Sequence, residues 1–196
     1  TSLIPLIDLG LFRLGGGQLF LDLALGSMGR YRGGAAKASV LASSLFGSIS
    51  GSAVANVVTT GIVTIPLMKR SGLDPERAGA VEAVASTGGQ LLPPIMGAAA
   101  FIMADFLSVP YATVALAALM PALLFYVAIF AQIHLRATRM GMPRLEAEER
   151  PSLRSALRAR WTFLIPLVVL LYVLFFTGRQ PAEAAIVAVV LVYLAA

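Results

Sequence analysis

The 196-residue sequence has no cysteine and one histidine, and only 13% of its residues are charged. The absence of thiols rules out disulfides and thiolate metal sites. No charged residue occurs from 38 to 68 or from 83 to 104, so neither stretch offers carboxylates for a divalent ion or a titratable group for proton transfer. The chain also lacks phosphate-loop, zinc-helix and nucleophile-elbow motifs. ATP hydrolysis and the common hydrolase chemistries therefore have no support.

Apolar residues dominate what is present. They make up 58% of the chain, and the mean hydropathy of +0.85 is typical of helical proteins that cross a membrane several times. The length allows about five or six spans of ~20 apolar residues. The sequence begins at a threonine and ends inside an apolar run, so we expect it to be part of a longer chain. The apolar segments are roughly 1–12, 18–29, 38–68, 78–106, 111–135, 161–177 and 182–196.

The basic residues indicate a membrane topology. They gather in the gaps at 30–37, 69–77 and 136–160, whereas the turn at 105–111 has none. Short cytoplasmic loops carry the excess of lysine and arginine. All three basic gaps become cytoplasmic if 38–68 enters and leaves the membrane by the same face. A helix over the first third of that segment would rise ~16 Å, about half of the hydrocarbon core. We therefore predict a re-entrant helical hairpin.

The turn of this hairpin and a second irregular stretch are predicted from glycine, serine and proline. The hairpin tip reads GSISGSAVAN at 47–56. Segment 78–106 would be ~43 Å long as one helix, which exceeds a span, and its middle reads STGGQLLPP at 86–94. This pattern predicts a broken spanning helix with Pro93 and Pro94 in the first turn of its second half. A kinked but continuous helix is the alternative.

The tip and the break are expected at the same depth, where they can face each other as in secondary transporters. Their hydroxyls and accessible carbonyls predict a neutral oxygen cage, which suits a monovalent cation such as sodium and a small substrate. For any single hydroxyl, a bond back to its own helix is the alternative. The candidate sodium and substrate residues are Ser48, Ser50, Gly51, Ser52, Asn56, Ser86, Thr87, Gly88, Gly89, Pro93 and Pro94.

Three titratable residues border these segments. By the topology above, Glu82 lies about one turn from the cytoplasmic end of its helix and Asp105 lies near the external end. We interpret both as interfacial rather than as parts of a proton path. His134 borders the basic linker, and we interpret it as an interface residue rather than a ligand.

The run from GSISGSAVAN through IPLMKRSG to GGQLLPP resembles the large membrane subunit of tripartite ATP-independent periplasmic (TRAP) transporters. It is most similar to the fused permeases that work with TAXI-type solute-binding proteins, over about residues 16–181. One departure is Ile95, where many relatives have a serine after the double proline.

The resemblance implies a multi-pass permease of the bacterial inner membrane that imports small organic anions (carboxylates) by sodium symport and an elevator mechanism. It implies a periplasmic TAXI-type binding protein and a fused small membrane subunit as partners. It implies sodium as the coupling ion, no other cofactor, no nucleic acid and no enzymatic activity. An ion channel or an intramembrane enzyme that uses the same hairpin is the alternative, although no histidine, cysteine or acid pair at midplane depth favours an enzyme.

The expected fold is an all-α polytopic membrane protein that forms one half of an inverted-repeat elevator transporter. Its parts are the end of a transmembrane helix with an interfacial helix (1–32), a re-entrant hairpin (33–69) and a broken helix (76–106) that form a transport domain over 33–106, a transmembrane helix (107–135), a cytoplasmic linker (136–160) and the truncated start of a second repeat (161–196).

Overall fold

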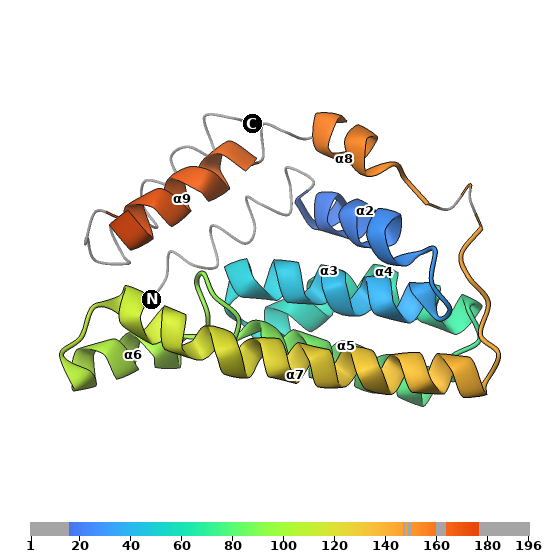
Figure 1. Ribbon diagram of the computed structural model, residues 1–196, viewed down its shortest axis with the longest axis horizontal. Coiled ribbons are helices and arrows are strands. Elements are labelled where there is room, and N and C mark those ends of the chain that lie inside the picture. The colour runs from blue at the N-terminus through green and yellow to red at the C-terminus, as the bar shows by residue number, and fades with distance from the viewer. Residues whose placement is uncertain (1–15, 147, 149, 160–163, 177–196) are drawn as a thin grey trace.

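The computed structural model describes residues 16–146, 148, 150–159 and 164–176. This part of the chain is helical and contains no strand, which confirms the all-α class. Figure 1 shows α3, α4, α5 and α7 packed lengthwise, with α2 on the far side of α3 from α7. The helices are α2 (Gly16–Met28), α3 (Gly34–Ser50), α4 (Ala53–Arg70), α5 (Pro75–Gly89), α6 (Ala98–Leu107), α7 (Tyr111–Arg139), α8 (Leu153–Ala159) and α9 (Leu164–Phe176).

Helices α3 and α4 form a hairpin with a two-residue turn. Gly51 ends α3 in the left-handed conformation, with φ of 64°, and its N–H donates to the Gly47 carbonyl at 2.9 Å. Ser52 then adopts an extended conformation, and its hydroxyl accepts a hydrogen bond from the N–H of Ala55, which caps α4. The turn is tighter than the sequence predicted, because the serines up to Ser50 remain helical.

The chain between α5 and α6 is irregular over residues 90–97. Pro93 and Pro94 lie inside this break, so the prediction that they begin the second half-helix is wrong. The next residues bond elsewhere: the Ile95 N–H donates to the Ser48 carbonyl at 3.0 Å. Met96 has a φ of 57°, which a right-handed helix cannot accommodate. Helix α6 can therefore begin only at Ala98.

Helix α7 has 29 residues and is the one helix of the described chain that is long and apolar enough to cross a membrane. It extends past the predicted segment 111–135 to Arg139, and large apolar side chains such as Leu116 and Leu124 are exposed on it. Apolar surface outside a helical bundle is expected where lipid replaces water. The further spans expected from composition stay a prediction.

The described residues of the predicted linker 136–160 pack against the bundle. Its first four residues belong to α7, and the chain then runs along the start of the hairpin, where the Gly33 N–H donates to the Pro143 carbonyl at 3.3 Å. The Leu145 N–H donates to the Gly29 carbonyl at 3.2 Å, and α8 packs on α2. Residues 1–15 and 177–196, which hold the predicted first and last apolar segments, lie outside the described residues.

Candidate ion site at the hairpin tip and the helix break

Helix α3 of the hairpin contacts α5 at two glycines, Gly47 and Gly89. A Cβ atom on Gly89 would lie 2.6 Å from the Cα of Gly47, and one on Gly47 would lie 2.8 Å from the Cα of Gly89. Real side chains do not approach a backbone so closely, so α3 and α5 touch here through their main chains. Small residues at such crossings let membrane helices approach closely.

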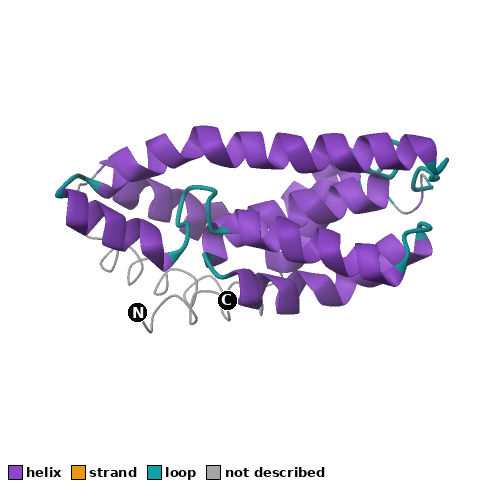
Figure 2. Cartoon of the chain, turned by 90° about the horizontal axis from the view of Figure 1, so that it is seen from below, coloured by secondary structure: helices purple, strands orange, loops and turns teal. Residues whose placement is uncertain are grey.

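The hairpin tip rests directly on the break. A Cβ on Gly51 would lie 2.0 Å from the carbonyl oxygen of Met96, and Ser48 accepts a hydrogen bond from Ile95 on the far side of the two prolines. The two loops lie side by side at the same end of α3 and α5 (Figures 1 and 2). The structure thus brings together the tip and the break, as the sequence led us to expect.

Four helix ends meet at this contact. Helix α3 ends at Ser50 and α5 ends at Gly89, while α4 begins at Ala53 and α6 begins at Ala98. The C-terminal end of a helix carries partial negative charge and the N-terminal end partial positive charge. The ends of α3 and α5 therefore favour a cation, whereas the starts of α4 and α6 can offer N–H groups to an anion.

Two of the candidate hydroxyls bond back to their own helices. The Ser48 hydroxyl donates to the Leu45 carbonyl at 2.8 Å. The Thr87 hydroxyl donates to the Ala83 carbonyl at 2.8 Å, and its side chain is exposed on the outer face of α5. Thr87 therefore does not contribute its hydroxyl to the tip. It follows the alternative, in which a hydroxyl bonds back to its own helix.

Ser50 and Asn56 are buried under the tip. The Ser50 oxygen lies 3.4 Å from the N–H of Ser52. The Asn56 side chain is fully buried, and its amide donates to the Ser43 carbonyl at 2.8 Å, which ties α4 to α3. Ser86 is also fully buried, but its hydroxyl donates to Glu82 at 3.3 Å and not to the tip.

Glu82 is the polar residue whose surroundings the sequence did not reveal. Its side chain is 0% exposed and lies between α3, α4 and α5, so it is enclosed by helices, while its interfacial depth in the membrane stays a prediction. Its hydrogen-bond partners on the hairpin were not among the residues predicted from the sequence. These partners are the hydroxyls of Ser43 at 2.7 Å and Thr60 at 2.5 Å from Oε1, and of Thr64 at 2.6 Å from Oε2.

A local signal for this cluster was present in the sequence. Glu82 and Ser86 are four residues apart, as are Thr60 and Thr64, and such pairs share one face of a helix. Two polar faces on neighbouring helices of an apolar chain indicate that the helices bury these faces against each other.

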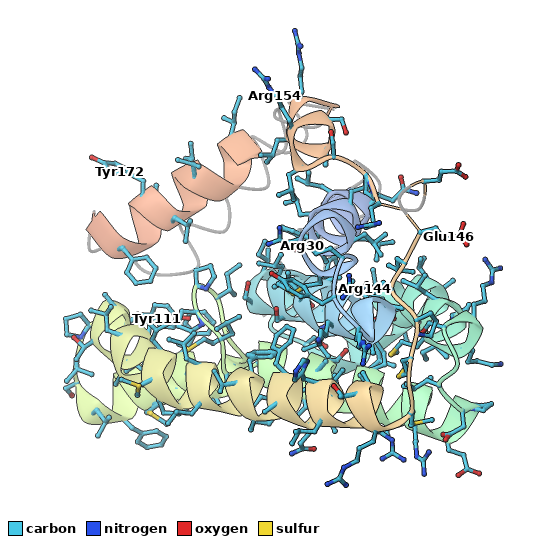
Figure 3. The ribbon with its side chains drawn as sticks, turned by 45° about the vertical axis from the view of Figure 1, so that its right-hand side comes forward. Arg30, Tyr111, Arg144, Glu146, Arg154 and Tyr172 are labelled. Carbon is cyan, nitrogen blue, oxygen red and sulfur yellow. The ribbon has the colours of Figure 1, made fainter. Side chains whose placement is uncertain are left out.

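The break is anchored on α7. The Tyr111 hydroxyl lies 2.9 Å from the Pro94 carbonyl and 2.5 Å from the Ile95 carbonyl. Figure 3 shows Tyr111 near one end of α7, with Arg30 and Arg144 toward the other end of the bundle. At that other end, Lys37 Nζ lies 3.0 Å from Nδ1 of His134, which therefore joins α7 to the hairpin.

Comparison with known proteins agrees with the family resemblance seen in the sequence. Residues 9–196 match the family model described as "Tripartite ATP-independent periplasmic transporter, DctM component". The chain is 34% identical over 184 residues to the C4-dicarboxylate TRAP transporter large permease protein DctM of Pseudomonas aeruginosa, covering 92% of this chain and 42% of that protein. It is 32% identical over 173 residues to the protein of the same description from Vibrio cholerae, covering 87% and 37%.

A third relative carries a different substrate name. The chain is 30% identical over 173 residues to the sialic acid TRAP transporter permease protein SiaT of Haemophilus influenzae, covering 87% of this chain and 27% of that protein. The chain thus spans less than half the length of these relatives.

Proposed function

Because the chain belongs to the DctM component family of tripartite ATP-independent periplasmic transporters, we propose that it is part of a permease that imports small organic anions by sodium symport. The family consists of membrane-embedded transporter components and not of enzymes. Since the chain spans less than half of its relatives, the transport activity is proposed for the full-length protein.

The observation that carries the sodium proposal is the meeting of two helix C-termini at the hairpin tip. The ends of α3 and α5 touch at Gly47 and Gly89, where partial negative charge and carbonyl oxygens gather. Within the described chain, the side chains at the tip are neutral. A monovalent ion suits such a site, and we propose as ligands the backbone around Ser48 and Gly51 with the polar groups of Ser50, Ser52 and Asn56.

The substrate proposal comes from the relatives and the helix N-termini. The related permeases are named for C4-dicarboxylates and for sialic acid, which are carboxylates. The first turns of α4 and α6 lie next to the tip and can donate N–H groups to a carboxylate. We propose a periplasmic binding protein of the TAXI type as the donor of substrate, and a small membrane subunit fused in the full chain.

The transport step proposed is an elevator movement of the hairpin together with α5. The close contact at Gly47 and Gly89 and the buried bonds from α3 and α4 to Glu82 join these three helices into one packed unit. A re-entrant position of the hairpin in the bacterial inner membrane accords with the basic residues at its outer end, such as Lys69 and Arg70.

Alanine substitution at the tip tests this proposal. Ser50→Ala, Ser52→Ala and Asn56→Ala should each raise the sodium concentration needed for half-maximal uptake, by about three- to tenfold for loss of one oxygen contact. Uptake is measured with the full-length protein in proteoliposomes, with its binding protein outside. Thr87→Ala is the matched control, because that hydroxyl is exposed and bonds to its own helix.

Unchanged sodium activation in all three tip variants would contradict the sodium site. Flux that does not saturate and does not need the binding protein would instead indicate a channel.

A further inference from the structure

Lys37 is a buried cation without a carboxylate partner. It lies near the start of α3, and 6% of its surface is exposed. Among the described residues, no aspartate or glutamate forms an ion pair with it. A buried charge is costly unless an opposite charge or enough hydrogen bonds compensate it. The start of a helix carries partial positive charge, and no side chain caps α3, so this position favours an anion.

The contacts of Lys37 give its ammonium group few acceptors. The group has three hydrogens to donate and accepts none. Its Nζ lies 3.0 Å from Nδ1 of His134 and 5.6 Å from the centre of the Tyr31 ring. The first contact uses one hydrogen, and the second is a cation–π contact, which attracts the charge but provides no acceptor oxygen. Because His134 accepts at Nδ1, its own hydrogen is on Nε2, and it is a further donor at this place.

A second cation lies on the same tyrosine ring. The guanidinium carbon of Arg30 is 5.0 Å from the centre of the Tyr31 ring, and its Nη2 donates to the Tyr31 hydroxyl at 2.9 Å. No carboxylate of the described chain forms an ion pair with Arg30. Arg144 lies at the same end of the bundle (Figure 3), where the Leu145 N–H bonds to Gly29. Arg30 and Tyr31 are exposed, so a ligand can reach this group of donors from outside the bundle.

From this excess of donors we infer that Arg30, Lys37 and the start of α3 form a binding site for the phosphate headgroup of an anionic phospholipid. A guanidinium group binds two phosphate oxygens at once, and an ammonium group adds a compact positive charge.

Inorganic phosphate has the same chemistry, but the position of the site favours the lipid. The chain belongs to a membrane-embedded family, and the site lies at the basic end of the bundle, for which we predict a cytoplasmic location. Basic pockets between membrane helices on that side bind anionic headgroups. Tyr31, which is 43% exposed, is an aromatic residue of the kind that lies at the level of the headgroups.

The site is shared by several elements. Lys37 comes from the hairpin, His134 from α7, and Arg30 from the connection between α2 and α3. A bound headgroup therefore holds these elements together at the end of α3 opposite the tip. The inference rests on the proposed function for its membrane setting only, and it does not depend on the sodium site.

Lipid binding to the purified full-length protein tests this inference. The protein in detergent micelles with phosphatidylcholine is titrated with phosphatidylglycerol, and bound lipid is measured by native mass spectrometry. The wild type should retain phosphatidylglycerol in preference to phosphatidylcholine. Lys37→Met and Arg30→Gln should each weaken this binding about tenfold, the effect of losing a hydrogen bond to a charged group. Arg70→Gln is the matched control, because it removes the same charge from an exposed side chain at the same end of the bundle.

Wild-type binding of phosphatidylglycerol in Lys37→Met or in Arg30→Gln overturns the inference. An equal loss in Arg70→Gln also overturns it, since that result indicates general attraction to basic residues. If Lys37→Met does not fold, Arg30→Gln decides alone, because Arg30 is exposed.

Inorganic phosphate is titrated separately into the micelles without phosphatidylglycerol. A protein that binds inorganic phosphate but does not prefer phosphatidylglycerol over phosphatidylcholine has a site for the free ion, which overturns the lipid assignment. Failure of the proposed function is distinguishable, because it appears in the sodium activation of uptake by the Ser50, Ser52 and Asn56 variants.

Discussion

Two glycines set the distance between the hairpin and α5. Gly47 and Gly89 face each other so closely that neither has room for a methyl group. In lipid, where burial of apolar surface does not drive helices together, such backbone contact and the polar bonds beside it hold the helices in place. The proximity of the tip to the break therefore depends on glycine at both positions, because only glycine has no Cβ atom.

Gly89→Ala is expected to lower the thermal unfolding midpoint of the full-length protein. The added Cβ would lie 2.6 Å from the Cα of Gly47, and overpacking of this kind costs about 1–3 kcal/mol. Gly79→Ala on the same helix is the matched control, because nothing lies within 4 Å of its Cβ position. Alanine there should leave the midpoint unchanged or raise it, since alanine favours helix by ~1 kcal/mol over glycine. An equal loss in both variants would refute the close contact.

At the level of elements, the break between α5 and α6 depends on its neighbours. Its backbone is held by Ser48 of the hairpin and by the Tyr111 hydroxyl of α7, which lies within hydrogen-bonding distance of the Pro94 and Ile95 carbonyls. Phe101 of α6 stacks on Tyr111 with ring centroids 4.5 Å apart. A loop held by two neighbouring elements can keep carbonyls in place for an ion without regular structure.

Tyr111→Phe should loosen the break while leaving the helices intact. The variant loses one hydrogen bond, worth about 0.5–1.5 kcal/mol, to a carbonyl that then has no such donor. Hydrogen exchange of the amides at 95–97 should become faster by about two- to tenfold. Tyr31→Phe is the control, because Tyr31 is exposed. Exchange that is as slow as in the wild type would mean that Tyr111 does not anchor the break.

Across the whole molecule, the segment after α7 fastens the hairpin to α2 and α8. Residues 140–146 run beside the start of α3, with backbone bonds from Gly33 to Pro143 and from Leu145 to Gly29. Leu145 is buried, with 8% of its surface exposed. The segment that composition indicated to be a charged linker is therefore packed over residues 140–146, which we call the strap.

Leu145→Ser should release this strap. Burial of a leucine is worth about 1.5–3 kcal/mol, so its loss should make local opening at least about tenfold more frequent. Limited trypsin digestion of the full-length protein would report this as faster cleavage after Arg144. Leu157→Ser on α8 is the control, since Leu157 is 40% exposed. If both variants are cleaved at the wild-type rate, the strap does not depend on Leu145.

The sequence was sufficient for features that depend on local chemistry. Composition indicates helices in an apolar setting, GSISGS predicts the hairpin turn, and the glycines and prolines of GGQLLPP predict the break, because these residues restrict the backbone wherever they stand. The start of α6 was misjudged, since the residues after Pro94 bond to the hairpin before a helix can begin.

The tertiary structure alone decided the surroundings of Glu82. Its hydroxyl partners on the hairpin stand 18 to 39 residues away in the sequence. Whether they meet depends on how the three helices are rotated about their axes. The close contact of Gly47 and Gly89 sets α3 against α5, and the bond from Asn56 to the Ser43 carbonyl sets α4 against α3. The sequence determined that the hairpin tip is neutral, whereas only the packing of three helices placed the carboxyl group of Glu82 between α5 and both arms of the hairpin, because side-chain direction follows from helix orientation.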